Sequence, residues 1–187
     1  MTLSKKTAIP EWKSTPNRNK LRVWSAGSST GEEAYSVAMT LSGSIPSHWD
    51  TKILATDIDT DVVARGRSAV YSSDRLGSLK PQRVSEYFDK VTVDGKAFVR
   101  VKKSLREMTH FKALNLLQAW PMSGQFKMIL CRNVVIYFDK ATQKVLFDRF
   151  ADLLVVGGFL LIGHSESVYK LSDRFTSLGN TVYRKLK

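Results

Sequence analysis

The first third of the chain alternates between short apolar runs and amphipathic segments. Residues 21–26 predict a buried strand, and residues 32–42 carry apolar side chains at helical spacing. Residues 52–56 predict a second strand that ends at Asp57, and a further helix should follow to about residue 68. A strand, a helix and a strand within about 35 residues make a βαβ unit, which predicts a parallel sheet.

Polar residues mark where the two helices should begin. Thr30 and Glu33 stand three positions apart, which is the spacing of a capping box. Asp59 or Thr60 can cap the second helix in the same way.

The middle of the chain has a different pattern. A short helix is expected at residues 81–88, and residues 90–93 and 97–101 alternate around Asp94-Gly95. This dipeptide between alternating segments is a strong β-hairpin signal. It predicts a small antiparallel β-subdomain, at about residues 89–106, inserted into the parallel domain.

The last third returns to the α/β pattern. Gly157-Gly158 should end the last helical region, and Gly179-Asn180 should join a terminal hairpin. The remaining expected elements are strands at 109–113 and 127–131, a helix at about 141–154, a buried strand at 159–163, and hairpin strands at 175–178 and 181–186.

A parallel sheet that closes with an antiparallel hairpin separates two nucleotide-binding folds. Dinucleotide oxidoreductases usually continue in parallel, whereas class I S-adenosylmethionine methyltransferases place a reversed last strand in the sheet. The expected fold is therefore a Rossmann-like α/β methyltransferase sheet with helices on both faces. It should occupy residues 21–187, after an irregular basic N-terminal arm at residues 1–20.

Length and composition fit one such domain in the cytoplasm. The chain has 187 residues, of which 43% are hydrophobic, and its apolar runs are too short to cross a bilayer. Residues 1–20 are polar and basic, unlike a signal peptide, and Cys131 is the only cysteine. We expect a cytoplasmic protein with no membrane insertion and no internal disulfide.

The net charge of +12 admits nucleic acid, an anionic membrane or an acidic protein as partner. Part of the charge lies in residues 1–20, where a solvated tail is the plain alternative, and a second group lies at residues 96–106. Neither group is interleaved with the aromatic residues of a single-strand stacking platform. We therefore expect no nucleic-acid binding.

Candidate chemistry begins at the turn between the first strand and the first helix, residues 26–31. In open α/β sheets ligands bind at this turn, and Gly27 would let a ligand approach the backbone closely. The turn is not G-x-G-x-x-G and lacks a P-loop lysine, so a triphosphate is not expected. By itself the pattern fits a plain turn equally well.

Three polar residues strengthen the case for a ligand. Asp57, at the end of the second strand, is placed to accept both hydroxyls of a ribose; the alternative is a helix cap, which Asp59 or Thr60 can already supply. Glu33 either serves the capping box or pairs with the ammonium of a bound amino acid. Asn115 either hydrogen-bonds an adenine edge or satisfies a loop.

The densest signal follows the fourth parallel strand, in residues 131–138 (CRNVVIYF). Arg132 and Asn133 are polar where the strand meets the expected cleft, and burying them without partners would be costly. Tyr137 could place its hydroxyl near a reacting centre. The alternatives are a salt-bridged arginine and a core tyrosine with a solvated tip.

Other reactive side chains give weaker evidence for a functional site. Cys131 is expected to be a buried core thiol, since no base stands beside it in the sequence. His164 is either a general base or a histidine that orders its loop. No Cys/His cluster has metal-ligand spacing, so no metal is expected.

Several ordered motifs resemble those of the CheR-type chemotaxis receptor methyltransferases, specifically their C-terminal S-adenosylmethionine-binding domain. The first is residues 24–36 (WSAGSSTGEEAYS), and the densest is residues 131–140 (CRNVVIYFDK). The others are residues 55–60, 115–117, 163–166 (GHSE) and 181–183. The resemblance runs over nearly the whole chain, from residue 21 to residue 183.

The resemblance implies an S-adenosylmethionine-dependent protein-glutamate O-methyltransferase. It would esterify side-chain carboxylates of methyl-accepting chemoreceptors, leaving S-adenosylhomocysteine. Separately from the resemblance, we expect a monomer. The inserted hairpin would dock a receptor C-terminal peptide, and its basic charge suits an acidic partner. Tyr137 and Arg132 would lie at the reacting centre. The positions that would line the cofactor pocket are Gly27, Glu33, Asp57, Asn115, Leu116, Arg132, Asn133 and Tyr137.

The sequence departs from the family pattern in two respects. Family members usually carry an N-terminal helical domain of roughly 70 to 90 residues, which ends in a Thr-x-Phe-Phe-Arg segment; residues 1–20 do not contain that segment. Ala34 and Ser28 replace a usual proline and cysteine. A working methyltransferase is favoured; the alternative is a non-catalytic cofactor-binding or receptor-interaction module, and an RNA methyltransferase ranks third.

Overall fold

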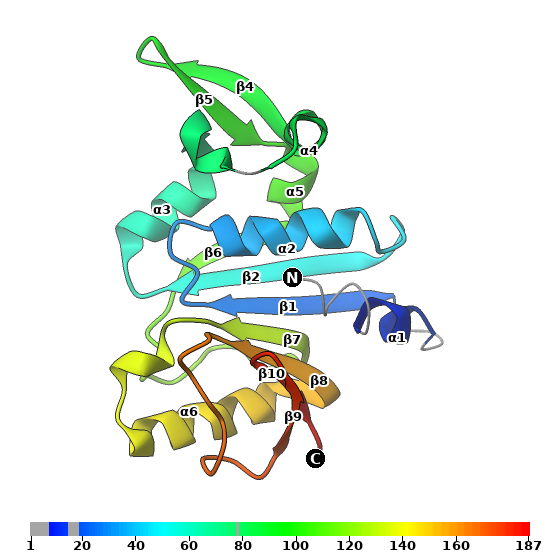
Figure 1. Cartoon of the computed structure of the whole chain (residues 1–187), viewed down its shortest axis with the longest axis vertical. Coiled ribbons are helices and arrows are strands. Elements are labelled where there is room, and N and C mark those ends of the chain that lie inside the picture. Colours follow the sequence, from blue (N-terminus) through cyan, green and yellow to red (C-terminus); the bar gives the residue numbers. More distant parts are fainter. Residues whose placement is uncertain (1–7, 15–18, 78) are drawn as a thin grey trace.

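The computed structural model describes residues 8–14, 19–77 and 79–187, and most of its strands form one seven-stranded sheet (Figure 1). These strands are β1 (Lys20–Ala26), β2 (Asp50–Asp57), β6 (Thr109–Ala113), β7 (Phe126–Cys131), β8 (Leu154–Ile162), β9 (Phe175–Gly179) and β10 (Val182–Lys185). Their order across the sheet is β6-β2-β1-β7-β8-β10-β9. The first five are parallel, and β10 runs antiparallel between β8 and β9. The predicted parallel sheet with a reversed terminal hairpin is confirmed.

Helices cover both faces of this sheet, as predicted. The helices α2 (Glu32–Ser42) and α3 (Thr60–Ser68) share a cluster of buried apolar residues with one face, which includes Val23. The helix α6 (Lys140–Leu153) shares a second cluster with the opposite face, which includes Trp24. Neighbouring residues of β1 point to opposite faces because side chains alternate along a strand. The sheet is thus buried on both sides of its centre.

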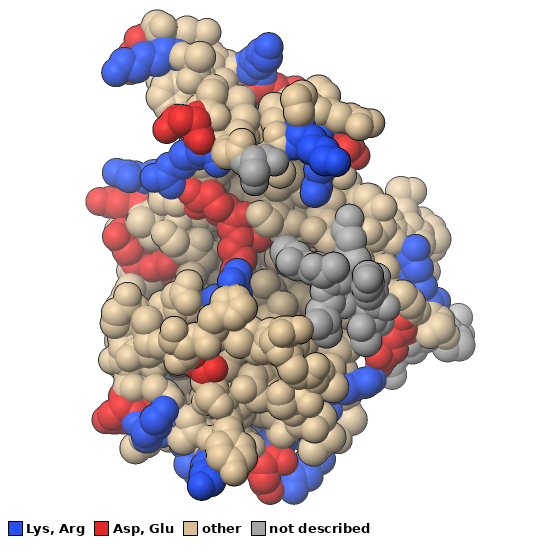
Figure 2. All heavy atoms as spheres, viewed as in Figure 1, with Lys and Arg blue, Asp and Glu red and all other residues tan. Residues whose placement is uncertain are grey.

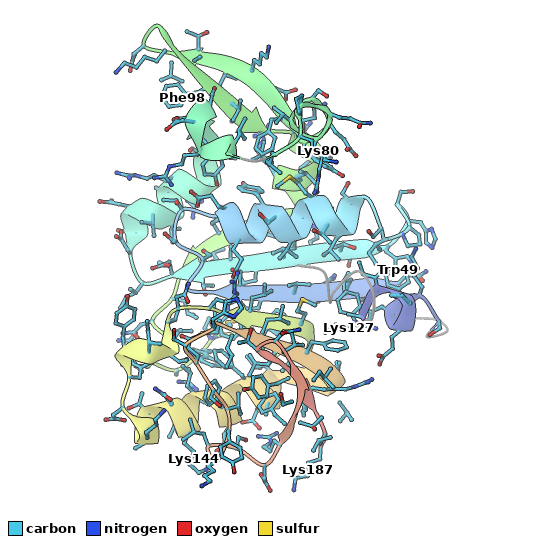
Figure 3. All side chains as sticks on the ribbon, in the orientation of Figure 1. Trp49, Lys80, Phe98, Lys127, Lys144 and Lys187 are labelled. Atoms are coloured by element: carbon cyan, nitrogen blue, oxygen red, sulfur yellow. The ribbon has the colours of Figure 1, made fainter. Side chains whose placement is uncertain are left out.

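A second, three-stranded antiparallel sheet stands at one end of the molecule (Figure 1). Its hairpin turns at Asp94 and Gly95, whose φ angles are 49° and 72°, as the sequence predicted. In Figure 3, Phe98 of this sheet and Lys144 of α6 lie at opposite ends of the molecule. The strands of this three-stranded sheet are β3 (Val70–Ser72), β4 (Phe88–Val93) and β5 (Lys96–Val101). Their order across the sheet is β3-β5-β4.

The small sheet is larger than the expected hairpin, because β3, which comes from an earlier part of the chain, pairs with β5. Three residues are too few to show a period of two, so the sequence pattern missed this strand. Short helical segments surround the sheet: η2 (Ser73–Leu76), α4 (Pro81–Tyr87) and α5 (Lys103–Met108). Only α4 was predicted.

The expectation of an irregular N-terminal arm is wrong for the residues that form α1 (Ile9–Ser14). Ile9 and Trp12 are buried, and the Trp12 ring meets Phe159 edge to face at 6.3 Å between centroids. Glu11 forms an ion pair with Arg184 of β10. Tertiary packing stabilises this helix, which is too short to be stable alone. Of the other residues of the expected arm, Lys20 begins β1, and residues 1–7 and 15–18 lie outside the described residues.

Two local predictions were also wrong. Gly157-Gly158 does not end a helical region, since α6 ends at Leu153 and both glycines lie within β8, where the pairing with β7 shifts register. The capping box is absent: Gly31, with φ 95°, caps α2, and the Thr30 hydroxyl donates to Glu32 at 2.6 Å. Glu33 is thereby free for contacts elsewhere.

The surface charge is mixed rather than collected in one stripe. On the face shown in Figure 2, basic side chains lie at the small-sheet end and at the opposite end, with acidic ones between and beside them. None of the helices formed by the described residues is long and apolar enough to span a lipid bilayer.

Candidate functional site

The turn between β1 and α2 is tied to the end of β2. The backbone N–H groups of Gly27 and Ser28 both donate to the Thr56 carbonyl at 2.8 Å. Gly27 has φ 74°, and a Cβ there would lie 2.3 Å from Cγ2 of Val134. Only glycine combines this backbone conformation with such a close approach. The turn therefore packs directly against the segment that follows β7.

Asp57 ends β2 beside this turn. One carboxylate oxygen accepts from the Ser29 N–H at 2.8 Å, and the other accepts from the Asp59 N–H at 3.2 Å. Each oxygen can accept a further bond, because a carboxylate has about four lone-pair sites. Asp59, not Asp57, caps α3, accepting from the N–H groups of Asp61 and Val62 at 2.8 and 3.3 Å. The helix-cap alternative for Asp57 is therefore wrong.

A cleft of about 550 Å³ lies beyond the carboxyl ends of β1, β2, β6 and β7. In Figure 1 the arrows of β1, β2 and β7 point toward this edge. The structure brings together seven of the eight residues predicted to bind a cofactor; all but Glu33 line the cleft. The seven are Gly27, Asp57, Asn115, Leu116, Arg132, Asn133 and Tyr137.

Sequence reasoning missed six further lining residues, five of them apolar side chains adjacent to a residue that was predicted. They are Ser29, Ile58, Leu114, Leu117, Val134 and Phe138. Their position beside the polar residues of each motif was the only available signal. Together they give the cleft apolar walls with a few polar groups, which is the usual make-up of a small-molecule site.

Asn115 and Tyr137 both line this cleft. The Asn115 side-chain oxygen accepts from the Leu117 N–H at 2.9 Å, so its loop role is confirmed. That bond leaves the amide nitrogen, which donates to no described residue, for a ligand. Tyr137 lies in η3 (Val135–Tyr137) and is 80% exposed, so the alternative of a core tyrosine is wrong.

Glu33 lies next to the cleft and joins it through Arg132. Its carboxylate accepts from the Ser25 hydroxyl at 3.0 Å and from the Arg132 guanidinium at 3.2 Å. Burial raises the pKa of the Glu33 carboxyl, and the bonds from Ser25 and Arg132 only partly offset this effect. Arg132 is thus salt-bridged, as one alternative proposed, while it also lines the cleft.

The raised pKa of Glu33 predicts a pH-dependent stability difference for Glu33→Gln. The folded protein holds the proton more tightly than the unfolded chain, so stability falls as pH rises from the ordinary carboxyl pKa through the raised one. The variant lacks this loss. Its Tm relative to the natural protein should therefore rise through that window and stay constant above it, which thermal unfolding between about pH 4 and pH 8 measures.

Glu32→Gln is the matched control at the adjacent position. The pKa of Glu32 is lowered, because hydrogen bonds from Thr30 and Arg75 outweigh the effect of burial. Its stability contribution is lost as pH falls, so the Tm difference for this variant should change in the opposite direction. A Glu33→Gln difference that is flat, or that falls with rising pH, would contradict the assignment.

Arg149 of α6 holds the loop that carries Asn115, and sequence reasoning gave no sign of it. Its guanidinium stacks 3.8 Å from the Trp120 ring centroid and donates to the Leu116 carbonyl at 2.8 Å and to the Gln118 carbonyl. These partners lie about thirty positions earlier in the chain, so no local pattern links them. Arg149 thus ties the loop that lines one wall of the cleft to α6.

The other reactive side chains do not join the site. Cys131 is fully buried, and burial raises the pKa of its thiol well above the usual value, as expected for a core cysteine. His164 is exposed and does not line the cleft. Among the described residues no group of three or more His, Cys, Asp or Glu side chains is placed to hold a metal ion.

The sheet order, the reversed terminal strand and the cleft at the carboxyl edge together define an α/β domain of the S-adenosylmethionine methyltransferase type. Residues 1–184 match the family model "CheR methyltransferase, SAM binding domain". The chain therefore belongs to the CheR methyltransferase family, in agreement with the resemblance of its motifs.

Comparisons with individual proteins agree with this membership. The chain is 46% identical to a chemotaxis protein methyltransferase of Escherichia coli (strain K12), over 87% of this chain and 57% of that protein. It is 42% identical to a probable chemotaxis protein methyltransferase of Rhizobium etli, over 88% and 63%. The chain thus spans about three fifths of the length of these relatives.

A solved structure supports the fold alone. PKMT2 from Rickettsia typhi, solved in complex with AdoHcy, superposes with a TM-score of 0.50 at 14% identity, covering 84% of this chain and 25% of that chain.

Proposed function

We propose that this domain binds S-adenosylmethionine in the cleft and transfers its methyl group to glutamate side chains of chemoreceptors. Family membership supports the reaction, and the cleft supports the cofactor. The single observation that carries the proposal is the convergence of Asp57, Asn115 and Arg132 from three separate segments at one 550 Å³ cleft. Because the proposed substrate is the cytoplasmic domain of a receptor, the protein is proposed to act in the cytoplasm.

The donor set suits the parts of this cofactor. The Asp57 carboxylate can accept two ribose hydroxyls while keeping its backbone bonds. The Asn115 amide nitrogen can donate to an adenine edge, with Ile58 and Leu117 offering apolar contact to the base. Glu33, paired with Arg132 beside the cleft, is the carboxylate proposed to meet an ammonium, and Arg132, which lines the cleft, is the cation proposed to meet a carboxylate. Gly27 lines the cleft without a side chain, so a ligand can approach its backbone.

The chemistry asks little acid–base work of the protein. When bound, S-adenosylmethionine supplies a methyl group on a sulfonium: the ester O–C bond forms as the C–S bond breaks, and the sulfur keeps the electron pair. A glutamate carboxylate is ionised at neutral pH and needs no base. The residues of the chain must instead hold the reactants in line. Tyr137 and Arg132, at the cleft wall, are the proposed residues of the reacting centre.

The small sheet is the proposed contact for a receptor C-terminal peptide. β4 is an edge strand of that sheet, so its free backbone edge can accept an added strand. Lys90, Lys96 and Arg100 are exposed on β4 and β5 and would attract an acidic segment. In this proposal the protein acts as a monomer.

Incubation with methyl-labelled S-adenosylmethionine and receptor cytoplasmic fragments tests the proposal. We expect base-labile label on the receptor, as methyl esters give, and none on a fragment whose candidate glutamates are replaced by alanine. Calorimetric binding of S-adenosylhomocysteine without transfer would instead support a cofactor-binding module that needs further chain or a partner. Label on RNA, or no binding at all, would contradict the proposal.

A further inference from the structure

Glu166 is a buried carboxylate that neither the proposed chemistry nor the predicted site uses. The residue is 7% exposed and lies just after β8. One oxygen accepts from the N–H groups of Val134 and Ile136 at 2.8 and 3.3 Å. The other accepts from Asn133 at 3.1 Å and from Gly163. All four donors are backbone groups, so the carboxylate fastens main chain rather than side chains.

The charge of Glu166 has no ion-pair partner among the described residues. A buried carboxylate is costly unless hydrogen bonds replace its lost hydration. Four N–H donors in two pairs supply that replacement, because bonds to a charged acceptor are stronger than neutral ones. Substituting a neutral group would therefore weaken the four contacts together.

Three of the four backbone donors belong to the turn after β7, which carries polar residues that line the cleft. Asn133 has φ 59°, the left-handed region that non-glycine residues rarely adopt. Arg132 precedes it, and Val134 and Tyr137 follow it along the cleft. A residue held in such a conformation requires support from its surroundings. Three of the four bonds to Glu166 come from this turn and supply that support.

Gly163 shows how closely these groups are packed. A Cβ at this position would lie 2.5 Å from the Asn133 side-chain oxygen and 2.8 Å from a Glu166 carboxylate oxygen. The end of β8, the turn after β7 and Glu166 thus form one assembly without space for another carbon.

We propose that Glu166 is a positioning residue for the cofactor site. Its carboxylate holds the turn after β7 in the shape that places Arg132 and Tyr137 along the cleft. This inference rests on the proposed function only in assuming that the cleft binds the nucleoside cofactor. Glu166 itself does not line the cleft.

Glu166→Gln is the direct test, because the side chain keeps its shape but turns an NH2 group toward one pair of N–H donors. We expect the Kd for S-adenosylhomocysteine to rise at least about tenfold by calorimetry. Hydrogen exchange at Asn133, Val134, Ile136 and Gly163 should accelerate, while exchange along β1 stays unchanged. Glu166→Asp keeps the charge on a shorter side chain and should restore part of the affinity, and it serves if the glutamine variant does not fold.

Lys185→Met is the control for a general loss of stability. Lys185 is buried on β10 and donates to the Leu154 carbonyl at 2.7 Å, away from the cleft. This variant should lower Tm but leave the Kd unchanged. The inference is overturned if Glu166→Gln binds S-adenosylhomocysteine with the Kd of the natural protein. It is also overturned if Glu166→Gln and Lys185→Met lose affinity in the same proportion to their loss of Tm. Failure of the natural protein to bind S-adenosylhomocysteine at all would instead sink the proposed function, while the exchange measurement would still report whether Glu166 holds the turn.

Discussion

Replacing Asp57 with alanine should weaken S-adenosylhomocysteine binding by about 1.5–3 kcal/mol, roughly 10- to 150-fold. The variant loses a carboxylate that can accept two ribose hydroxyls, and charge-assisted bonds of this kind are about twice as strong as neutral ones. The variant also leaves the N–H groups of Ser29 and Asp59 without the carboxylate to which they now donate. Calorimetric titration of the natural and variant proteins measures the difference.

Asp59→Ala separates the ribose contact from local stability. Asp59 lies two positions further on and caps α3, so its loss should lower Tm while leaving affinity nearly unchanged. Asp57→Asn should fall between the natural protein and the alanine variant, because the amide retains one acceptor. Equal affinities for natural protein and Asp57→Ala would show that the carboxylate does not grip the sugar.

Gly27→Ala should remove cofactor binding and destabilise the fold. The new Cβ would meet Val134 at 2.3 Å in a backbone conformation with φ 74°, so both steric overlap and backbone strain oppose it. Each effect costs about 1–3 kcal/mol. Relief requires the turn or Val134 to move, and both line the cleft. We expect more than about a tenfold loss of affinity for S-adenosylhomocysteine and a lower Tm.

Gly66→Ala is the matched control, because its Cβ would also lie 2.3 Å from a neighbouring side-chain carbon, here of Phe111. Gly66 lies in α3 and does not line the cleft. This variant should lower Tm as well, yet bind the nucleoside normally. If the two alanine variants lose affinity in parallel, the effect of Gly27 comes from stability and not from the shape of the turn.

Much of the fold was predictable because its signals are local. The alternation around Asp94-Gly95 specified a hairpin, since that dipeptide adopts the left-handed conformations the turn requires. Polar residues limited the cap of α3 to Asp59 or Thr60, and apolar spacing predicted the boundaries of α2. Conversely, α1 and β3 escaped prediction, because packing against distant strands stabilises segments too short to show a period.

The candidate site divides in the same way. The sequence alone determined which polar residues follow each parallel strand, and the carboxyl ends of parallel strands must meet at one edge of the sheet. This was enough to place seven of the eight predicted residues at the cleft. It was also enough to indicate the family, because motifs are contiguous in the chain.

Only the tertiary structure decided how those residues are held. Glu33 meets Arg132 across 99 positions, and Arg149 reaches the Leu116 carbonyl across 33. Glu166 fastens a turn that begins 33 positions before it. The capping-box spacing of Glu33 was misleading because Gly31 caps the helix and leaves the glutamate to the ion pair. Such contacts depend on strand register and loop path, and these are set by the packing of the whole sheet rather than by any local pattern.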